Sequence, residues 1–124
     1  MIAGIGTDLC RIARMEKGLA SPAFLRRVYG PEERALLETH TGTARLSTAA
    51  ANFAAKEAFL KAAGVGIGAF AMSDIQVLRR KSGAPYYQLS GTAAEFLAGR
   101  SLTAHISLTH EGEYALAFAV LESA

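Results

Sequence analysis

The sequence predicts a single domain of mixed helices and strands, built around one long helix. Three observations support this prediction: a helical apolar pattern over residues 47–68, an apolar run over 113–122, and a strand–turn–strand pattern over 73–89. The chain has 124 residues, 51% of them apolar. This length allows one core and is short for two, so we expect residues 1–124 to form one domain.

The segment over residues 47–68 carries the strongest helical signal and an unusual placement of charge. Residues three and four apart lie on one face of a helix. The face defined in this way comprises Leu46, Ala49, Ala50, Phe53, Leu60 and Gly64. Glu57 lies within it, where a core residue is expected, and Lys61 follows in the order that favours an ion pair. The pair is either a structural ion pair at the edge of the core or part of a functional site.

Three glycines, Gly64, Gly66 and Gly68, follow the predicted helix. Glycine can end a helix in the left-handed conformation, and a glycine-rich loop exposes backbone N–H groups that can meet an anion. No helical pattern begins after the third glycine, so the loop does not match a dinucleotide-binding fingerprint.

The chain is predicted to begin with a strand over residues 2–7 and to continue into a helix. The apolar positions of that helix are Leu9, Ile12, Met15 and Leu19. Asp8 lies at the expected strand-to-helix junction. An aspartate there is either an N-cap or a rigidly held, partly exposed metal ligand.

Two further helices are expected before the central one. Ser21 followed by Pro22 is typical of a helix start, and Pro31 begins another helix after a break at Tyr29 and Gly30. Residues 39–44 are predicted to form a polar connector.

The C-terminal half is predicted to contain a hairpin of residues 73–80 and 86–89, a short helix over 92–99, and strands over 103–109 and 113–122. In the first hairpin strand, the alternation places Arg79 on the same face as Ile75 and Val77.

The last strand is apolar at every interior position, so both its faces should be buried. One face is the small-residue row of Ala115, Ala117 and Ala119. We expect the alanine-rich central helix to pack closely there.

Charge and cysteine content narrow the function classes. The formal net charge of +2 does not indicate a nucleic-acid-binding protein. Cys10 is the single cysteine, which excludes an internal disulfide framework and fits a reducing compartment. No apolar stretch approaches the roughly 20 residues that span a membrane. We therefore expect a cytoplasmic protein that binds neither nucleic acid nor membrane.

Basic residues gather in the first quarter of the chain: Arg11, Arg14, Lys17, Arg26 and Arg27. They form either a surface for an acidic partner or an ordinary solvated helix face.

The residues able to support chemistry are Asp8, Glu57, Lys61 and His110, together with the glycine loop. His110 is either such a residue or ordinary polarity at the end of a strand. Two carboxylates without supporting cysteines favour a hard cation such as Mg²⁺, which completes its shell with water and phosphate oxygens. A phosphate-bearing substrate is expected, because phosphoryl chemistry is catalysed mainly by positioning and charge neutralisation.

The segments MIAGIGTDLCRIAR and NFAAKEAFLKAAGVGIG resemble the holo-acyl-carrier-protein synthases, which are small single-domain phosphopantetheinyl transferases. The resemblance continues through Gly83-Ala84-Pro85, Gly91 and HISLTHEGEYALAFAVLE, and so covers nearly the whole chain in order. It implies transfer of 4′-phosphopantetheine from coenzyme A to a serine of apo-acyl carrier protein. It also implies an α+β fold, in which a small antiparallel sheet packs on a long central helix, and a homotrimer with active sites between subunits.

The resemblance assigns roles to particular residues. Asp8 and Glu57 would be the Mg²⁺ ligands, and Lys61 would lie near the pyrophosphate. Either Glu57 or a water on the metal would take the serine proton, and the sequence does not decide between them. The terminal histidine of the coenzyme A pocket would be His110. The residues expected to line that pocket are Gly64, Gly66 and Ser107.

The resemblance also places Arg14 at a position that contacts the acidic helix of the carrier protein, while Arg26 and Arg27 are candidates on charge alone. Asn52 stands where many family members have an arginine. One phosphate or interface contact is therefore either missing or supplied by another residue.

Two other functions remain as alternatives. One is a non-catalytic module that binds an acyl carrier protein or a nucleotide, and it would be favoured by loss of either carboxylate. The other is a different Mg²⁺-dependent nucleotide enzyme such as a pyrophosphohydrolase, which usually has more clustered carboxylates than this pair.

Overall fold

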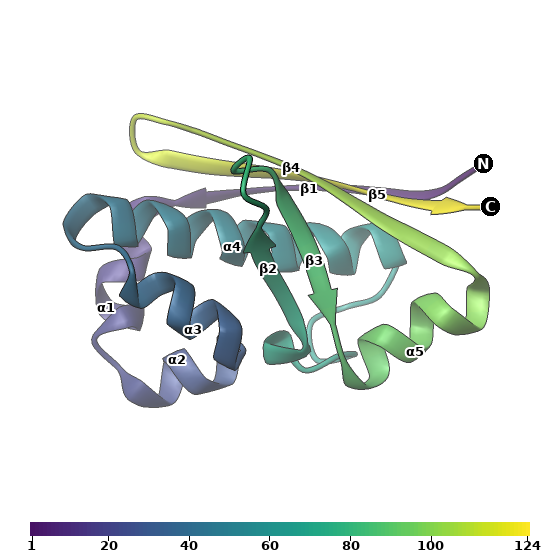
Figure 1. The fold of residues 1–124 in the computed structure, drawn as a ribbon, viewed down its shortest axis with the longest axis horizontal. Coiled ribbons are helices and arrows are strands. Elements are labelled where there is room, and N and C mark those ends of the chain that lie inside the picture. The colour runs from purple at the N-terminus through teal and green to yellow at the C-terminus, as the bar shows by residue number, and fades with distance from the viewer.

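The computed structural model describes residues 1–124 as a three-stranded antiparallel sheet with one long helix across its inner face (Figure 1). The sheet order is β1-β5-β4, and β2 and β3 form a separate hairpin. In chain order the elements are β1 (Ile2–Arg11), the 3-10 helix η1 (Ile12–Arg14), α1 (Met15–Leu19), α2 (Pro22–Val28), α3 (Pro31–Glu38), α4 (Gly42–Ala63), the 3-10 helix η2 (Met72–Asp74), β2 (Ile75–Arg79), β3 (Pro85–Leu89), α5 (Gly91–Arg100), β4 (Leu102–Glu111) and β5 (Tyr114–Ser123). The α+β prediction is confirmed.

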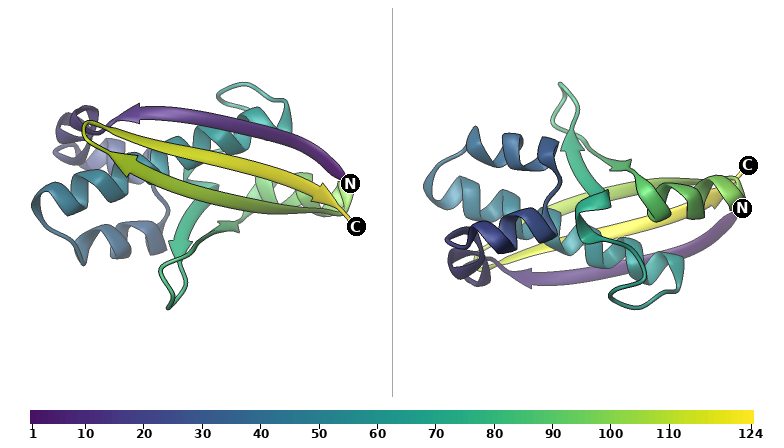
Figure 2. Two further views of the ribbon diagram at one scale, coloured as in Figure 1. Left: turned by 90° about the horizontal axis from the view of Figure 1, so that it is seen from above. Right: turned by 90° about the horizontal axis from the view of Figure 1, so that it is seen from below.

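The molecule has layers. The sheet covers one side of α4, while α1–α3 and the β2–β3 hairpin lie on the other side, and α5 lies at the far end (Figures 1 and 2). No helix in the chain is both long enough and apolar enough to cross a membrane.

Helix α4 lies unusually close to the sheet because the facing residues have almost no side chain. A Cβ at Gly4 would overlap the carbonyl of Ala62, and one at Gly6 would overlap that of Ala58. On β5, the row of Ala115, Ala117 and Ala119 is fully buried, as predicted. The expected packing of the alanine-rich helix on this row is therefore confirmed.

A buried ion pair that the sequence analysis missed joins α3 to the far side of α4. The side chains of Glu33 and Lys56 are fully buried, with 2.5 Å between Lys56 Nζ and Glu33 Oε1. Lys56 also donates hydrogen bonds to the carbonyls of Ile75 (2.6 Å) and Met72 (3.0 Å). Burial raises the pKa of Glu33 and lowers that of Lys56, and each charge opposes the shift of the other. Since loss of one partner would leave a buried unpaired charge, this pair fixes α3 and η2 against α4.

Several local signals in the sequence are confirmed. The Ser21 hydroxyl accepts a hydrogen bond from the Phe24 N–H at 3.2 Å, and Pro22 begins α2. Gly64 ends α4 in the left-handed conformation, with φ 73° and ψ 26°. The hairpin and α5 also form where predicted, and Ser101 in the left-handed conformation ends α5.

Three predictions about element boundaries and burial are wrong. Strand β1 continues to Arg11, so Asp8 lies within a strand and is not an N-cap, and Leu9 is exposed on that strand. Helix α4 begins at Gly42, inside the predicted connector. Strand β5 is buried on its alanine face only, and Phe118 on its other face keeps 38% of its surface exposed.

Candidate active site

The two predicted carboxylates come from β1 and α4, which lie in direct contact. Along β1, Gly6, Asp8 and Cys10 are the less exposed residues of the alternation, so Asp8 lies on the face toward α4. Lys61 Nζ donates a hydrogen bond to Asp8 Oδ1 at 3.2 Å and another to the Thr7 carbonyl at 2.9 Å. The structure therefore brings Asp8 and Lys61 together, and the expected Glu57–Lys61 ion pair does not form.

Glu57 lies close enough to Asp8 and Lys61 for their charges to affect its pKa. Burial raises the pKa of Glu57 above its ordinary value, and the charge of Asp8 raises it further, while Lys61 and Arg14 act in the opposite direction. Two carboxylates that repel each other in a partly buried place favour a bound cation. Cys10, two residues after Asp8 on β1, is fully buried, and its pKa is raised chiefly by burial. It is therefore a core thiol.

The donor set fits an open Mg²⁺ site better than a closed structural one. No group of three or more His, Cys, Asp or Glu side chains exists that could enclose a metal ion. Two carboxylates suit Mg²⁺, which uses one or two protein ligands and keeps positions for water and phosphate oxygens. Asp8 and Glu57 would hold such an ion.

The glycine loop begins one turn beyond Lys61. The N–H of Gly64 donates to the Lys61 carbonyl, and the N–H of Val65 donates to the Leu60 carbonyl, each at 3.0 Å. Gly66 and Gly68 are exposed, with open space where a Cβ would lie. The loop thus leaves a bare backbone next to the carboxylates and the lysine.

His110 lies in a different place, in a cavity of about 450 Å³. The cavity is bounded by the first half of α4, the β2–β3 hairpin and the end of β4. Its lining residues are Thr43, Ala44, Ser47, Thr48, Ala51, Arg79, Gly83, Pro85, Leu108, Thr109 and His110. Ser107 does not line this cavity. Side chains along β4 point alternately to the two faces of the sheet, and Ser107 lies on the outer face, opposite Phe118 of β5.

The chain therefore separates the predicted coenzyme A residues into two groups. Asp8 pairs with Ala117 on one side of β5, and Leu108 pairs with the same Ala117 on the other side. The acidic site and the His110 cavity thus lie at opposite edges of the sheet. Strands β1 and β4 are separated by two strand spacings, which amounts to about 10 Å. Gly64 and Gly66 belong with the acidic site.

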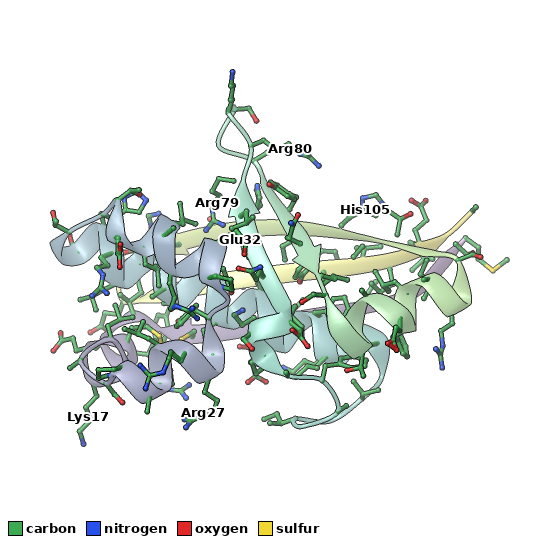
Figure 3. All side chains as sticks on the ribbon, turned by 60° about the horizontal axis from the view of Figure 1, so that its bottom comes forward. Lys17, Arg27, Glu32, Arg79, Arg80 and His105 are labelled. Carbon is green, nitrogen blue, oxygen red and sulfur yellow. The ribbon has the colours of Figure 1, made fainter.

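Arg79 is a cavity residue that the sequence analysis did not place in the site. Its Nη2 donates a hydrogen bond to Asn52 Oδ1 at 2.8 Å, and Asn52 is fully buried. Burial lowers the pKa of Arg79, and the charge of Glu33 partly opposes that shift. The alternation in β2 that grouped Arg79 with Ile75 and Val77 was the available signal. Figure 3 shows Arg79 on the α3 side of the hairpin and Arg80 on the other side.

Part of the predicted basic patch lines a groove of about 480 Å³ between α1, α2 and α4. The Arg14 guanidinium lies 5.5 Å from the centre of the Phe53 ring, and that of Arg27 lies 5.9 Å from the centre of the Phe24 ring. Lys17 also lines the groove, whereas Arg26 does not. Arg14 also acts on the pKa of Glu57, so this basic groove adjoins the acidic pair. Lys17 and Arg27 project from the α1–α2 end of the molecule in Figure 3.

Comparisons with known proteins agree on one family. Residues 4–119 match the model of the 4′-phosphopantetheinyl transferase superfamily. The chain is 45% identical over 125 residues to a holo-[acyl-carrier-protein] synthase of Myxococcus xanthus, covering 98% of this chain and 96% of that protein. It is 42% identical over 130 residues to a synthase of the same name from Herminiimonas arsenicoxydans, covering 98% of each.

Solved structures give the same result. A holo-(acyl-carrier-protein) synthase from Bacillus anthracis in complex with CoA (3′,5′-ADP) superposes with a TM-score of 0.85 at 35% identity, covering 100% of this chain and 99% of that one. The holo-[acyl-carrier-protein] synthase of Neisseria meningitidis gives a TM-score of 0.88 at 31% identity, covering 99% of this chain and 100% of that one. With its fold, its full-length match and the Asp8–Glu57–Lys61 cluster, the chain belongs to the 4′-phosphopantetheinyl transferase superfamily.

Proposed function

We propose that this chain transfers 4′-phosphopantetheine from coenzyme A to a serine of apo-acyl carrier protein, releasing adenosine 3′,5′-bisphosphate. The observation that carries this proposal is the meeting of Asp8 and Lys61 beside Glu57, at the contact between β1 and α4. A relative that is 45% identical carries the name of holo-[acyl-carrier-protein] synthase, which fits this chemistry.

In the proposed reaction, the serine oxygen bonds to the β-phosphorus of coenzyme A while the bond from that phosphorus to the bridging oxygen breaks. Mg²⁺ bound by Asp8 and Glu57 would supply positive charge against the diphosphate. Lys61 lies within reach of the same place and can stabilise negative charge on the departing bisphosphate. Glu57, with its pKa raised by burial and by Asp8, is suited to accept the serine proton.

The basic groove is the proposed docking site for the carrier protein. It combines Arg14, Lys17 and Arg27 with the exposed edges of Phe24 and Phe53, a combination that suits an acidic amphipathic helix. Phe53 lies one helical turn before Glu57, so a helix bound there would bring its serine close to the acidic pair. Arg26 lies outside the groove and is expected to contribute only long-range attraction.

We further propose that the chain assembles as a homotrimer through the outer face of the sheet. That face exposes Ile5 (59%) and Leu9 (57%) of β1 beside Tyr114, Leu116 and Phe118 of β5 (38% each). Contiguous apolar surface of this kind marks an interface, and a second copy is the proposed occupant. The number three comes from the family resemblance. Assembly would also let the acidic site of one subunit meet the His110 cavity of its neighbour, which a single chain keeps apart.

Replacing Glu57 with glutamine tests the acidic pair. Glu57→Gln keeps the shape of the side chain and removes its charge, so transfer should fall by at least about 100-fold while the protein stays folded. Mass spectrometry of apo-acyl carrier protein incubated with coenzyme A and Mg²⁺ measures the added phosphopantetheine arm. The control is Glu95→Gln on the exposed surface of α5, which should transfer normally. Full activity of Glu57→Gln would exclude the proposed role. Failure of the unsubstituted protein to modify any of several carrier proteins would exclude the function.

Charge reversal in the basic groove tests the docking site. Arg14→Glu and Arg27→Glu should each raise the KM for apo-acyl carrier protein by roughly 10-fold or more, because they place a negative charge against an acidic helix. The affinity for coenzyme A, measured by titration calorimetry, should not change in Arg27→Glu, whereas Arg14→Glu should also weaken it to a smaller extent, because the charge of Arg14 acts on Glu57. Arg26→Glu should have a smaller effect, and Arg100→Glu on α5 should have none. Equal effects of all four substitutions would show that the groove is not the docking site.

An aspartate on the outer sheet face tests the assembly. Phe118→Asp should convert the trimer to a monomer in sedimentation velocity, because it buries an unpaired charge in the proposed interface. Ala98→Asp, at an exposed residue of α5 that lies away from the outer sheet face, is the control and should leave the size unchanged. An unsubstituted protein that sediments as a monomer at micromolar concentration would contradict the trimer.

A further inference from the structure

The glycine loop leaves α4 at Gly64 and is fixed at both of its ends. At the first end, the Val65 N–H donates to the Leu60 carbonyl at 3.0 Å. At the other end, Phe70 is buried just before η2. Between these ends, residues 66–69 are exposed, and the N–H groups of residues 66–68 form no hydrogen bond within the chain. Consecutive free N–H groups of this kind can bind an anion, provided that the loop is held in place.

Lys56 holds the far end of the loop against α4. Its fully buried ammonium donates to the carbonyls of Met72 at 3.0 Å and of Ile75 at 2.6 Å, at the two ends of η2. An ammonium has three donors, and the third goes to Glu33. Because η2 directly follows the loop, the same side chain that fixes η2 also determines where the loop ends.

Glu33 fixes the direction of the Lys56 ammonium. Its Oε1 also accepts from the Gly30 N–H at 3.0 Å, and its Oε2 accepts from Asn52 at 3.0 Å. The carboxylate is thus held by the start of α3 and by α4 before it meets the lysine. An apolar pair of similar volume is often as stable as a buried ion pair, but it cannot donate to the two carbonyls of η2. The distinctive contribution of Lys56 is therefore geometric.

We propose that Lys56, oriented by Glu33, is a positioning residue for coenzyme A: it holds the glycine loop where the free N–H groups of the loop meet the diphosphate. The inference rests on the proposed function. Lys56 is buried and touches no substrate, but it precedes Glu57 on α4, so one helix carries the acidic site and sets the end of the loop. A loop released from this anchor must be ordered when the ligand binds, and this cost weakens binding.

The experiment compares coenzyme A with adenosine 3′,5′-bisphosphate in titration calorimetry with Mg²⁺. The bisphosphate carries two phosphate monoesters and no diphosphate. Lys56→Met should weaken binding of coenzyme A by about 10-fold and leave binding of the bisphosphate nearly unchanged. Tyr29→Phe is the matched control. It removes another buried hydrogen bond to α4, from the Tyr29 hydroxyl to the Ala49 carbonyl at 2.7 Å, and should change neither affinity.

The double variant Glu33→Gln/Lys56→Met separates positioning from general stability. The single variant leaves a buried carboxylate without its partner, so its Tm should fall, and removing that charge should restore much of the Tm. The affinity for coenzyme A should stay as low as in Lys56→Met, because methionine still cannot bind the carbonyls of η2. Recovery of this affinity together with the Tm would overturn the proposal. Equal weakening of both ligands by the double variant, or no weakening of either, would also overturn it.

Amide exchange followed by NMR tests the anchor itself. In the double variant, the Asp74 N–H, which donates to the Ala71 carbonyl at 3.0 Å, should exchange faster because η2 is no longer held. The Val65 N–H, at the other end of the loop, should keep its protection. Unchanged exchange at Asp74 would contradict the role of Lys56 as an anchor.

The outcomes also separate this inference from the proposed function, because binding is measured without a carrier protein. If Lys56 supports binding of coenzyme A but the unsubstituted protein modifies no carrier protein, the transferase function alone is contradicted. If the unsubstituted protein modifies the carrier protein and the double variant binds coenzyme A with full affinity, the positioning role alone is contradicted.

Discussion

The close approach of α4 to the sheet is the constraint on which the rest of the structure depends. Gly4 and Gly6 let the backbone of β1 meet the carbonyls of α4, and the alanine row of β5 continues the same flat surface. This packing places Asp8 on the strand beside Glu57 and Lys61 on the helix. With larger residues in the seam, the helix would stand away from the strand, and the three charged groups would not share one site.

Close packing also explains why charge is tolerated at the seam. Small residues on both sides leave room for polar side chains at its rim, and Asp8 retains 19% of its side-chain exposure. The far side of α4 is different, because there Glu33 and Lys56 are fully buried and every buried polar side-chain atom has a partner. One face of the helix thus holds a satisfied, structural ion pair. The other holds an unbalanced acidic pair suited to a ligand.

The sequence predicted those features whose causes are local. The Ser21–Pro22 helix start, the left-handed cap at Gly64 and the alanine face of β5 depend on a few neighbouring residues, and all three formed as expected. The position of Asp8 depends instead on the pairing of β1 with β5 as far as Arg11 and Tyr114, which no local pattern encodes. For the same reason Lys61 binds Asp8, far away in the chain, in place of Glu57 one turn away.

The candidate site was predictable in its residue types and only partly in its arrangement. Both carboxylates and the lysine are grouped as expected, whereas His110 and Ser107 lie on opposite faces of β4. The alternation of β2 groups Arg79 with Ile75 and Val77, but it does not predict the hydrogen bond from Arg79 to Asn52, because that contact joins two separate elements. The apolar run of β5 in so small a chain indicated that some sheet surface is left for a neighbour to cover, but not which face it is, since such a run looks the same for burial within a chain and between chains.

The central claim is that Asp8 and Glu57 converge on a single divalent cation. Anomalous diffraction from crystals grown with Mn²⁺ and coenzyme A tests it most directly, because the peak locates the ion without any assumption about activity. The account predicts one peak in contact with both carboxylates and with a phosphate oxygen of coenzyme A. A peak at another place, with neither Asp8 nor Glu57 in contact with the ion, would contradict it.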